Sequence, residues 1–416
     1  MQKNNFTEEY VVAELKNGIK LIHKPVKSYV SHYGVFVNAG SRDELPEEAG
    51  IAHFIEHCIF KGTKKRKAFH ILSRLENIGG ELNAYTTKEE TCIYASFLNN
   101  FYKHTVELIS DIINNSTFPE KELTKEKDVI IDEINSYKDS PSEQIFDDFE
   151  ELIFNKHPLA SNILGTPENV KKFTKEDVLK FINKHYTSNR IVICSVGNIS
   201  FSKLLDMTNQ YMGDINNNEN GYKRIPFEKY KPIIKTVKYN TVQTHCVIGN
   251  IIFNSDDNRK TSLILLNNIL GGTGLNSRLN LSIREKYGYC YNLESSFNSL
   301  SDIGLATIYF GTDSEYLDKV NSLILKELKK LREIKLGSLQ LSKAKKQIIG
   351  QIAISQESNQ NEMLSIGRSF LLYNKVDTIE EVYKKLNNIT AENIIDVANE
   401  IYDEKNLSVL IYKPKK

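Results

Sequence analysis

The sequence predicts an α+β protein made of two domains of similar plan, each an antiparallel or mixed sheet packed against helices. Its 416 residues exceed what one compact core accommodates, so two or three domains are expected. Short β-rich runs alternate with longer helical patterns, and a polar segment separates two halves that resemble each other. The 54 basic and 53 acidic side chains nearly balance, which argues against a dedicated nucleic-acid binder. No apolar run approaches the roughly 18 residues that a membrane span needs.

The hydrophobic periodicity assigns the individual elements. Runs rich in β-branched and aromatic residues predict strands at 33–37, 92–97, 191–196, 246–253 and 407–412. Apolar residues at helical spacing predict helices at roughly 47–60, 68–78, 100–113, 120–137, 175–185, 260–270, 316–333, 340–357 and 391–402.

A segment near the middle of the chain breaks this pattern. Residues 213–232 are rich in Asn, Gly, Pro and charged side chains, which is typical of an interdomain linker. We therefore predict an N-terminal domain over 1–215, a linker over 216–232 and a C-terminal domain over 233–416.

The two halves share a pattern at one constant offset of 216 residues. Near the end of each half, a threonine, an acid and a tyrosine recur in the same order: Thr174, Glu176 and Tyr186 match Thr390, Glu392 and Tyr402. Each set predicts a helix with a threonine N-cap and an acid in its first turn, followed by a strand. Helix–turn–strand units can resemble each other without common origin, but the strand at Gly34 also falls opposite Asn250 in this register. The shared register favours a duplication.

The sharpest chemical signal is the H-x-x-E-H motif formed by His53, Glu56 and His57. At about 100° per residue the three side chains share one helix face. Two imidazoles at i and i+4 can bind one Zn²⁺, and Glu56 then lies beside the metal, placed to take a proton from a water molecule. The alternative is a core helix that carries these residues by chance. Ile51 and Ile55 indicate a largely buried helix, where such a cluster is costly unless it binds something.

A catalytic zinc needs a third protein ligand, and the helix predicted at 120–137 supplies two candidates. Glu126 and Glu133 share a face with Val129 and Ile130 at helical spacing. A carboxylate at this position is ordinarily a solvated helix end, and Glu126 fits that description. Glu133 lies deeper in the apolar pattern, so the spacing alone leaves open whether it is a ligand.

In the H-x-x-E-H motif the acid directly precedes the second histidine, whereas in H-E-x-x-H it directly follows the first. The H-x-x-E-H order is the inverzincin signature. On these residues the chain resembles the pitrilysin/insulinase family of metallopeptidases, and within it the half-size branch that includes the mitochondrial processing peptidase. The resemblance implies a duplicated metallopeptidase-like fold and one Zn²⁺ per chain, with Glu133, 76 residues after His57, as third ligand. It also implies that Glu126 supports the site without binding the metal. Cys58 departs from the family, which usually has methionine there, and we interpret it as a packing residue.

Other stretches fit the family in order, including 40–44 before the zinc helix and 60–63 after it. The stretch 79–87 matches the strand on which the family binds its substrate, and implies substrate-binding roles for Asn83, Ala84, Tyr85 and Thr86. An extended peptide pairs with such an open edge through main-chain hydrogen bonds. A plain hairpin after a Gly-Gly turn is the alternative.

The second half contributes one more signal. The glycine turn at 271–274 lacks the Gly-Lys-Ser/Thr of a phosphate-binding loop. The resemblance implies that Arg284 and Tyr291, seven residues apart, hold the substrate backbone and donate to the oxyanion. The alternative is a surface pair of Arg284 with Glu285 or Glu294, and a Tyr291 that packs in a strand.

Together these residues predict a zinc metalloendopeptidase that acts on peptides or unfolded segments. In the resembling family two halves close into a chamber, and Arg and Tyr come from the half opposite the zinc. Because this chain has both sets, a homodimer is expected, with a heterodimer containing a paralogue as the alternative. Rival functions are a non-catalytic partner subunit and a zinc enzyme acting on another bond.

Cysteine usage and the N-terminus bear on location. The five cysteines are odd in number, widely spread and without a C-x-x-C pair, and the first residues lack the apolar region of a secretory signal. A reducing cytosol is therefore expected, and the Lys-, Asn- and Ile-rich composition is compatible with a bacterial one. The balanced charge and the lack of a long apolar run predict neither nucleic acid nor a membrane as a partner.

Overall fold

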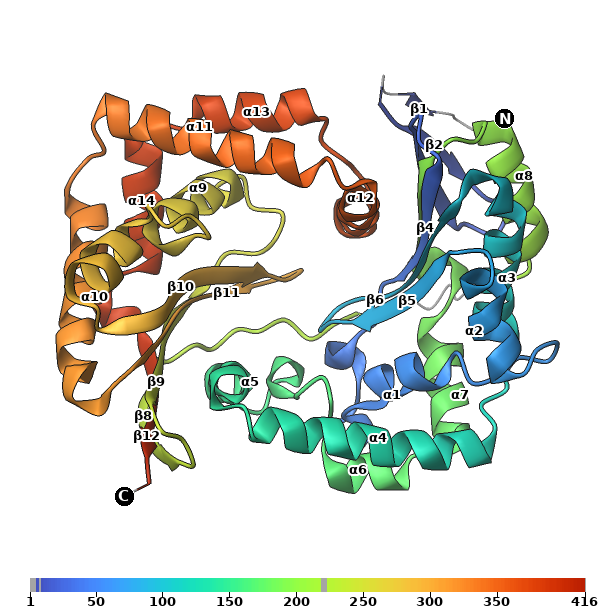
Figure 1. Cartoon of the computed structure of the whole chain (residues 1–416), viewed down its shortest axis with the longest axis horizontal. Helices are drawn as coiled ribbons and strands as arrows, with labels where there is room; N and C mark the ends of the chain where they lie inside the picture. Colours follow the sequence, from blue (N-terminus) through green and yellow to red (C-terminus); the bar gives the residue numbers. More distant parts are fainter. Residues whose placement is uncertain (1–4, 7–8, 218–222, 416) are drawn as a thin grey trace. The chain divides into compact units, whose positions relative to one another are not determined.

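The computed structural model describes residues 5–6, 9–217 and 223–415. The chain forms two compact units (Figure 1). The first unit contains Met1–Asn135, Ser161–Ile225 and Ser355–Val376, and the second contains Ser136–Ala160, Pro226–Ile354 and Asp377–Lys416. Among the described residues, no helix is long and apolar enough to cross a membrane.

The first unit is built on a seven-stranded mixed sheet of order β1-β2-β3-β7-β4-β6-β5. Only β3 and β7 pair in parallel. The strands are β1 (Asn5–Phe6), β2 (Val11–Glu14), β3 (Lys20–Pro25), β4 (Val30–Val37), β5 (Glu81–Thr86), β6 (Thr91–Leu98) and β7 (Ile191–Gly197). The helices are α1 (Ile51–Cys58), α2 (Ala68–Glu76), α3 (Tyr102–Asn115), α4 (Glu120–Lys138, whose last residues belong to the second unit), α6 (Pro167–Lys172), α7 (Lys175–His185), α8 (Phe201–Met212) and α12 (Asn359–Tyr373).

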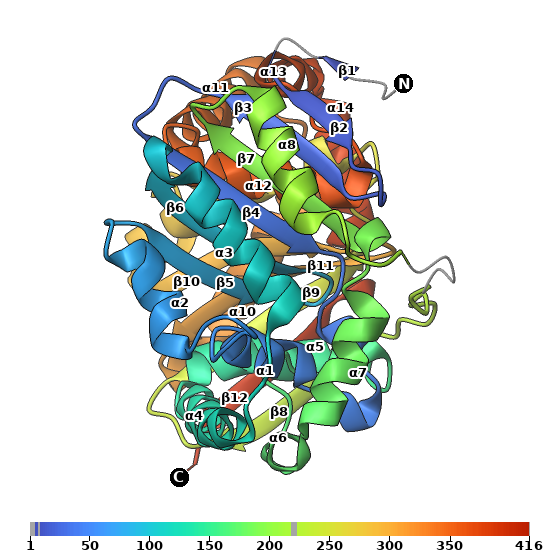
Figure 2. The same ribbon diagram turned by 90° about the vertical axis from the view of Figure 1, so that its right-hand side faces the viewer.

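Both faces of this sheet are covered. In Figures 1 and 2, α3 and α8 lie on one face and α12 on the other, in agreement with their strand contacts. Successive residues of β4 point to opposite faces, so Val35 enters the large core beneath α3 whereas Phe36 packs against Met363 of α12. A strand that is buried on both faces needs apolar residues at successive positions, as β4 has from Val35 to Val37.

The second unit is built on a five-stranded sheet of order β10-β11-β9-β12-β8. Its strands are β8 (Ile234–Tyr239), β9 (Thr244–Ile252), β10 (Cys290–Ser299), β11 (Gly304–Thr312) and β12 (Ser408–Pro414). Its helices are α5 (Pro141–Phe154), α9 (Lys260–Gly271), a π-helix (Asn280–Glu285), α10 (Leu317–Glu333), α11 (Ser338–Ser355), α13 (Ile379–Asn388) and α14 (Ala391–Ile401).

The two sheets share one connectivity, which confirms the predicted duplicated α+β fold. The order β5-β6-β4-β7-β3 corresponds to β10-β11-β9-β12-β8, and in each the last pair alone is parallel. Thr174 and Thr390 both cap their helices with a capping box, as expected from the repeat.

One helix of each predicted domain belongs to the unit that is built mainly from the other predicted domain. Helix α5 precedes the linker but packs on the second sheet, and α12 follows the linker but packs on the first. Each helix lies so close to its sheet that a glycine is needed at the contact. A Cβ at Gly249 in β9 would lie 2.8 Å from Phe149 in α5, and one at Gly367 in α12 would lie 2.1 Å from Phe36 in β4. Each sheet needs an apolar helix on its second face, and local sequence does not say which helix will provide it.

The predicted linker contains one of the points at which the chain passes from one unit to the other, at Ile225/Pro226. Residues 218–222 of it lie outside the described residues. Arg224 belongs to the first unit and donates to the two carboxylate oxygens of Asp43 at 2.9 and 2.8 Å. In the second unit the N–H of Phe227 donates to Asp302 at 2.8 Å. The linker is therefore anchored on both sides of this point by half-buried side chains.

All nine predicted helices and all five predicted strands are present, most of them with shifted ends. Helix α1 begins at Ile51 rather than at 47, because residues 46–48 form a 3-10 turn and Gly50 adopts φ 98°. The helices α5, α6, α8, α12 and α13 and the strands β1, β2, β3, β8, β10 and β11 were not predicted. Strand β10 is rich in Asn, Ser and Glu, which have low strand propensity, and α12 carries Gly367 in its interior.

Candidate metal centre

The position of α1 is set by two glycines in contact. Gly50 (φ +98°) precedes α1, and Gly165 (φ +73°) lies directly against it. A Cβ at Gly165 would be 2.3 Å from the carbonyl oxygen of Ala49, and one at Gly50 would be 2.7 Å from that of Leu164. Only residues without a Cβ allow this approach, so the start of α1 has a defined place.

The carboxylate of Glu44 satisfies the first N–H groups of α1. Its two oxygens accept from the N–H of Gly50 at 2.9 Å and of Ala52 at 2.8 Å. Burial raises the pKa of Glu44, and these two backbone hydrogen bonds act in the opposite direction. A negative group at a helix N-terminus is also favoured by the helix dipole.

The structure brings together the three residues predicted as metal ligands. Glu133 Oε2 lies 3.8 Å from His53 Nε2 and 3.5 Å from His57 Nε2. Their candidate ligating atoms all lie within 4.8 Å of one another, and in the described part of the chain this is the one group of three or more His, Cys, Asp or Glu so placed. His53 and His57 come from α1, and Glu133 comes from α4.

The donor set fits zinc, because two imidazoles and one carboxylate are ligands that Zn²⁺ prefers in proteins. Tetrahedral ligands of zinc lie roughly 3.3 Å apart, which is close to the 3.5 and 3.8 Å between Glu133 and the two histidines. Burial, aided by the nearby His57, lowers the pKa of His53 to about 4. His53 is therefore neutral near pH 7, which is the form that binds a metal.

Glu126 lies behind His57 rather than among the ligating atoms. Its Oε2 is 3.3 Å from His57 Nδ1, whereas His57 Nε2 faces Glu133. The Oε1 atom of Glu126 is 2.7 Å from Lys61 Nζ. This position agrees with a supporting role, since a carboxylate that accepts from one imidazole nitrogen fixes the other for the metal. No role was predicted for Lys61 from the sequence, although it lies in the stretch 60–63 four residues after His57.

Glu56 comes from the same helix as the two histidines, α1. Burial raises the pKa of its carboxyl group, the repulsion from Glu133 adds to this, and Thr86 and His57 act in the opposite direction. These neighbours indicate that Glu56 lies beside the cluster, and its carboxylate is not one of the three candidate ligands. A raised pKa makes the carboxylate a stronger proton acceptor.

The predicted substrate strand is the last strand of its sheet and lies next to α1. Strand β5 pairs with β6 on one side, as in Asn83↔Tyr94 and Ala84↔Ile93, and with no other strand of the described residues. The hydroxyl of Tyr85 donates to Glu90 at 2.8 Å, so this side chain is engaged within the unit. The second main-chain edge of β5 is therefore available for pairing, and its role as a substrate strand stays a prediction.

Arg284 and Tyr291 belong to the second unit. Arg284 is part of the π-helix, a rare conformation that often occurs at functional sites. Tyr291 is 81% exposed, at a register shift between Cys290 and Leu293, so it does not pack in the strand. Within the described residues Arg284 pairs with neither Glu285 nor Glu294. Their contribution to the metal centre stays a prediction.

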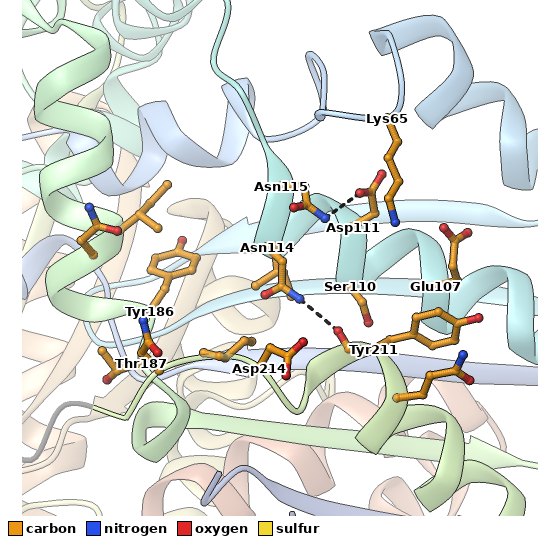
Figure 3. Close-up of a pocket in the computed structure, with 16 residues that line it drawn as sticks. Lys65, Glu107, Ser110, Asp111, Asn114, Asn115, Tyr186, Thr187, Tyr211 and Asp214 are labelled. Carbon is orange, nitrogen blue, oxygen red and sulfur yellow. Dashed lines mark hydrogen bonds between the residues drawn. The ribbon is translucent and has the colours of Figure 1, made fainter.

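A polar cavity of about 530 Å³ also lies in the first unit, among α3, α7 and α8 (Figure 3). Two of its lining amides are engaged: Asn114 donates to the Tyr211 carbonyl at 3.0 Å, and Asn115 to Asp111 at 2.9 Å. The cavity shares no residue with the metal centre.

Comparison with known proteins gives one consistent result. Residues 20–167 match the model of the insulinase family (Peptidase family M16), and residues 172–348 match the Peptidase M16 inactive domain. An uncharacterised zinc protease of Bacillus subtilis is 33% identical over 399 residues, covering 95% of this chain and 96% of the relative. The mitochondrial-processing peptidase subunit beta of Saccharomyces cerevisiae is 31% identical, covering 96% and 90%. The crystal structure of a protease from Helicobacter pylori has the same fold, with a TM-score of 0.90, 21% identity and coverage of 98% and 99%.

Proposed function

Because the chain belongs to the insulinase family of peptidases, Peptidase family M16, we propose that it is a zinc-dependent metalloendopeptidase. Its substrates are peptides or unfolded polypeptide segments, in peptide degradation or in the removal of a leader sequence. The observation that carries the proposal is the cluster of His53, His57 and Glu133 on the helix that also presents Glu56.

The residues divide the chemistry of amide hydrolysis among them. A zinc ion bound by His53, His57 and Glu133 would supply a Lewis acid and lower the pKa of a water molecule. Glu56 accepts a proton from the attacking water and returns it to the departing amine. Arg284 and Tyr291 hold the substrate backbone and donate hydrogen bonds to the oxyanion.

The edge of β5 aligns the substrate. An extended peptide adds to this edge through main-chain hydrogen bonds along Asn83, Ala84, Tyr85 and Thr86, so affinity depends little on side chains. In an extended peptide only every second backbone N–H points toward this edge. N-methylation of that set of amides should therefore weaken binding, whereas N-methylation of the other set should not.

The decisive experiment is mass spectrometry of a mixed peptide library after incubation with the enzyme. Cleavage by the zinc-loaded wild type is expected, with none after chelator treatment or for Glu56→Gln. Glu47→Gln, an exposed acid just before α1, is the matched control and should cleave normally. If Glu56→Gln that retains zinc cleaves at the wild-type rate, the assignment of the base is wrong.

We further propose a homodimer in which each chain supplies both residue sets. Mixed dimers of Glu56→Gln and Arg284→Ala should then recover part of the activity. An inactive mixed dimer, confirmed to contain both chains, would refute sharing across an interface.

A second candidate is a non-catalytic partner subunit of a peptidase heterodimer. It is favoured by the name of the yeast relative, which is one subunit of a processing peptidase. A wild-type chain with one zinc bound and no cleavage would support it.

A further inference from the structure

We propose that Lys61 is a positioning residue of the metal centre. Its ammonium group holds Glu126 in the orientation in which Glu126 accepts a hydrogen bond from His57 Nδ1, so that His57 Nε2 is directed toward the metal. The inference rests on the proposed zinc function and assigns a new residue to it.

The contacts form one continuous chain from Lys61 to the cluster. Lys61 Nζ is 2.7 Å from Glu126 Oε1, and Glu126 Oε2 is 3.3 Å from His57 Nδ1. His57 Nε2 in turn is 3.5 Å from Glu133 Oε2. Each oxygen of Glu126 therefore has one cationic or N–H partner, and both partners are needed to set the rotation of the carboxylate.

The backbone brings Lys61 to this place by hydrogen bonds between two loops. The segment after α1 is joined to the segment before α4: the hydroxyl of Ser116 donates to the Ile59 carbonyl at 2.9 Å. The N–H of Thr117 donates to the Gly62 carbonyl at 3.0 Å, and that of Lys64 to the Asn115 carbonyl at 2.9 Å. Lys61 thus extends from an ordered segment held against the base of the helix that carries Glu126.

The pair also differs from an ordinary surface ion pair. The side chain of Glu126 is 10% exposed and that of Lys61 is 29% exposed. On the same helix, Lys125 pairs with Glu122 at 2.9 Å, but the Lys125 side chain is 56% exposed. Exposed pairs of this kind contribute little, whereas a charge-assisted hydrogen bond to a shielded carboxylate restricts its motion. Lys125 is therefore a matched control.

Loss of Lys61 should weaken zinc binding. Without the ammonium group, Glu126 Oε1 has no partner in this chain of contacts, the carboxylate can rotate, and the imidazole of His57 loses its fixed acceptor. Outer partners of metal ligands change metal affinity by about 10–100-fold. Because Lys61 acts through Glu126, we expect the lower end, about tenfold.

The test measures the zinc dissociation constant by competition with a chromophoric chelator, without any peptide substrate. Lys61→Met should weaken binding about tenfold, Lys61→Arg should restore most of the affinity, and Lys125→Met should leave it unchanged. The double variant Lys61→Met/Glu126→Gln should bind zinc no more weakly than Glu126→Gln alone, because Lys61 acts through that carboxylate.

Two results would overturn the inference. One is a dissociation constant of Lys61→Met within twofold of wild type, and the other is full additivity of the two changes. Lys61→Ala repeats the comparison if the Met variant cannot be purified folded. A wild-type chain that binds no zinc would instead refute the proposed function, so the two failures are distinguishable.

Discussion

Replacement of Gly165 by alanine tests how the start of α1, the helix of the proposed metal centre, is held. Gly165 has φ +73°, and its added Cβ would lie 2.3 Å from the carbonyl oxygen of Ala49 and 2.6 Å from Cα of Gly50. The change therefore introduces two costs, one from the left-handed backbone and one from the overlap with residues that precede α1.

The chain offers a control that separates these costs. Gly79 has φ +74°, but a Cβ there would meet nothing within 4 Å. A left-handed alanine costs about 1–2 kcal/mol, partly offset by about 0.4–1 kcal/mol from the reduced freedom of the unfolded chain. Overlap in a packed region adds about 1–3 kcal/mol. We expect Gly79→Ala to destabilise the protein by about 1 kcal/mol and Gly165→Ala by about 2–4 kcal/mol.

Urea unfolding of the metal-free proteins measures this difference. Far-UV circular dichroism is the suitable probe, since the chain has no tryptophan. The midpoint should fall further for Gly165→Ala at an unchanged m value. Zinc affinity should also weaken for Gly165→Ala alone, because the overlap displaces Ala49 and Gly50 at the start of α1. Equal midpoints and equal zinc affinities for the two variants would refute the claim that this contact positions the helix.

Three further outcomes are expected. Burial, with Arg190 close by, lowers the pKa of His185 to about 3, so the native state keeps this side chain neutral while the unfolded chain takes up a proton. The free energy of unfolding should therefore fall as the pH drops from 6.5 toward 3. In His185→Gln, urea titrations should show a shallower dependence of this free energy on pH. Zinc at 100 times its dissociation constant should stabilise the wild type by about 2.7 kcal/mol in thermal unfolding, and Glu133→Gln should abolish this shift. Arg224→Met leaves the fully buried Asp43 carboxylate with a single, more distant cation, Arg190 at 3.6 Å, and should lower the free energy of unfolding by about 2–3 kcal/mol. Arg259→Met, which removes an exposed ion pair, should lower it by less than about 1 kcal/mol, and equal losses would contradict the role of the Arg224 anchor.

The local parts of the fold and site were predictable because short-range spacing encodes them. Two histidines at i and i+4 with an intervening acid identify a helix face, and α1 presents them as expected. The threonine caps of α7 and α14 follow from the same kind of pattern. Glu133 was different: its spacing left the question open, and only the family resemblance favoured it as a ligand.

Strand β10 and helix α12 escaped prediction for a physical reason. Four of the ten residues of β10 are exposed polar residues, as its place at the edge of the sheet allows, so the apolar alternation is weak. In α12 an interior glycine lowers helix propensity, yet Gly367 is needed there for the ring of Phe36. In both cases tertiary packing outweighs local preference.

The sequence by itself determined the H-x-x-E-H face of α1 and the duplicated α+β plan, because residue type and short-range periodicity carry both. The tertiary structure decided which sheet α5 and α12 cover, that β5 has an open edge beside α1, and that Lys61 meets Glu126 behind His57. These contacts join residues up to hundreds of positions apart. Their free energy arises only when the whole unit packs, so no local pattern in the sequence records them.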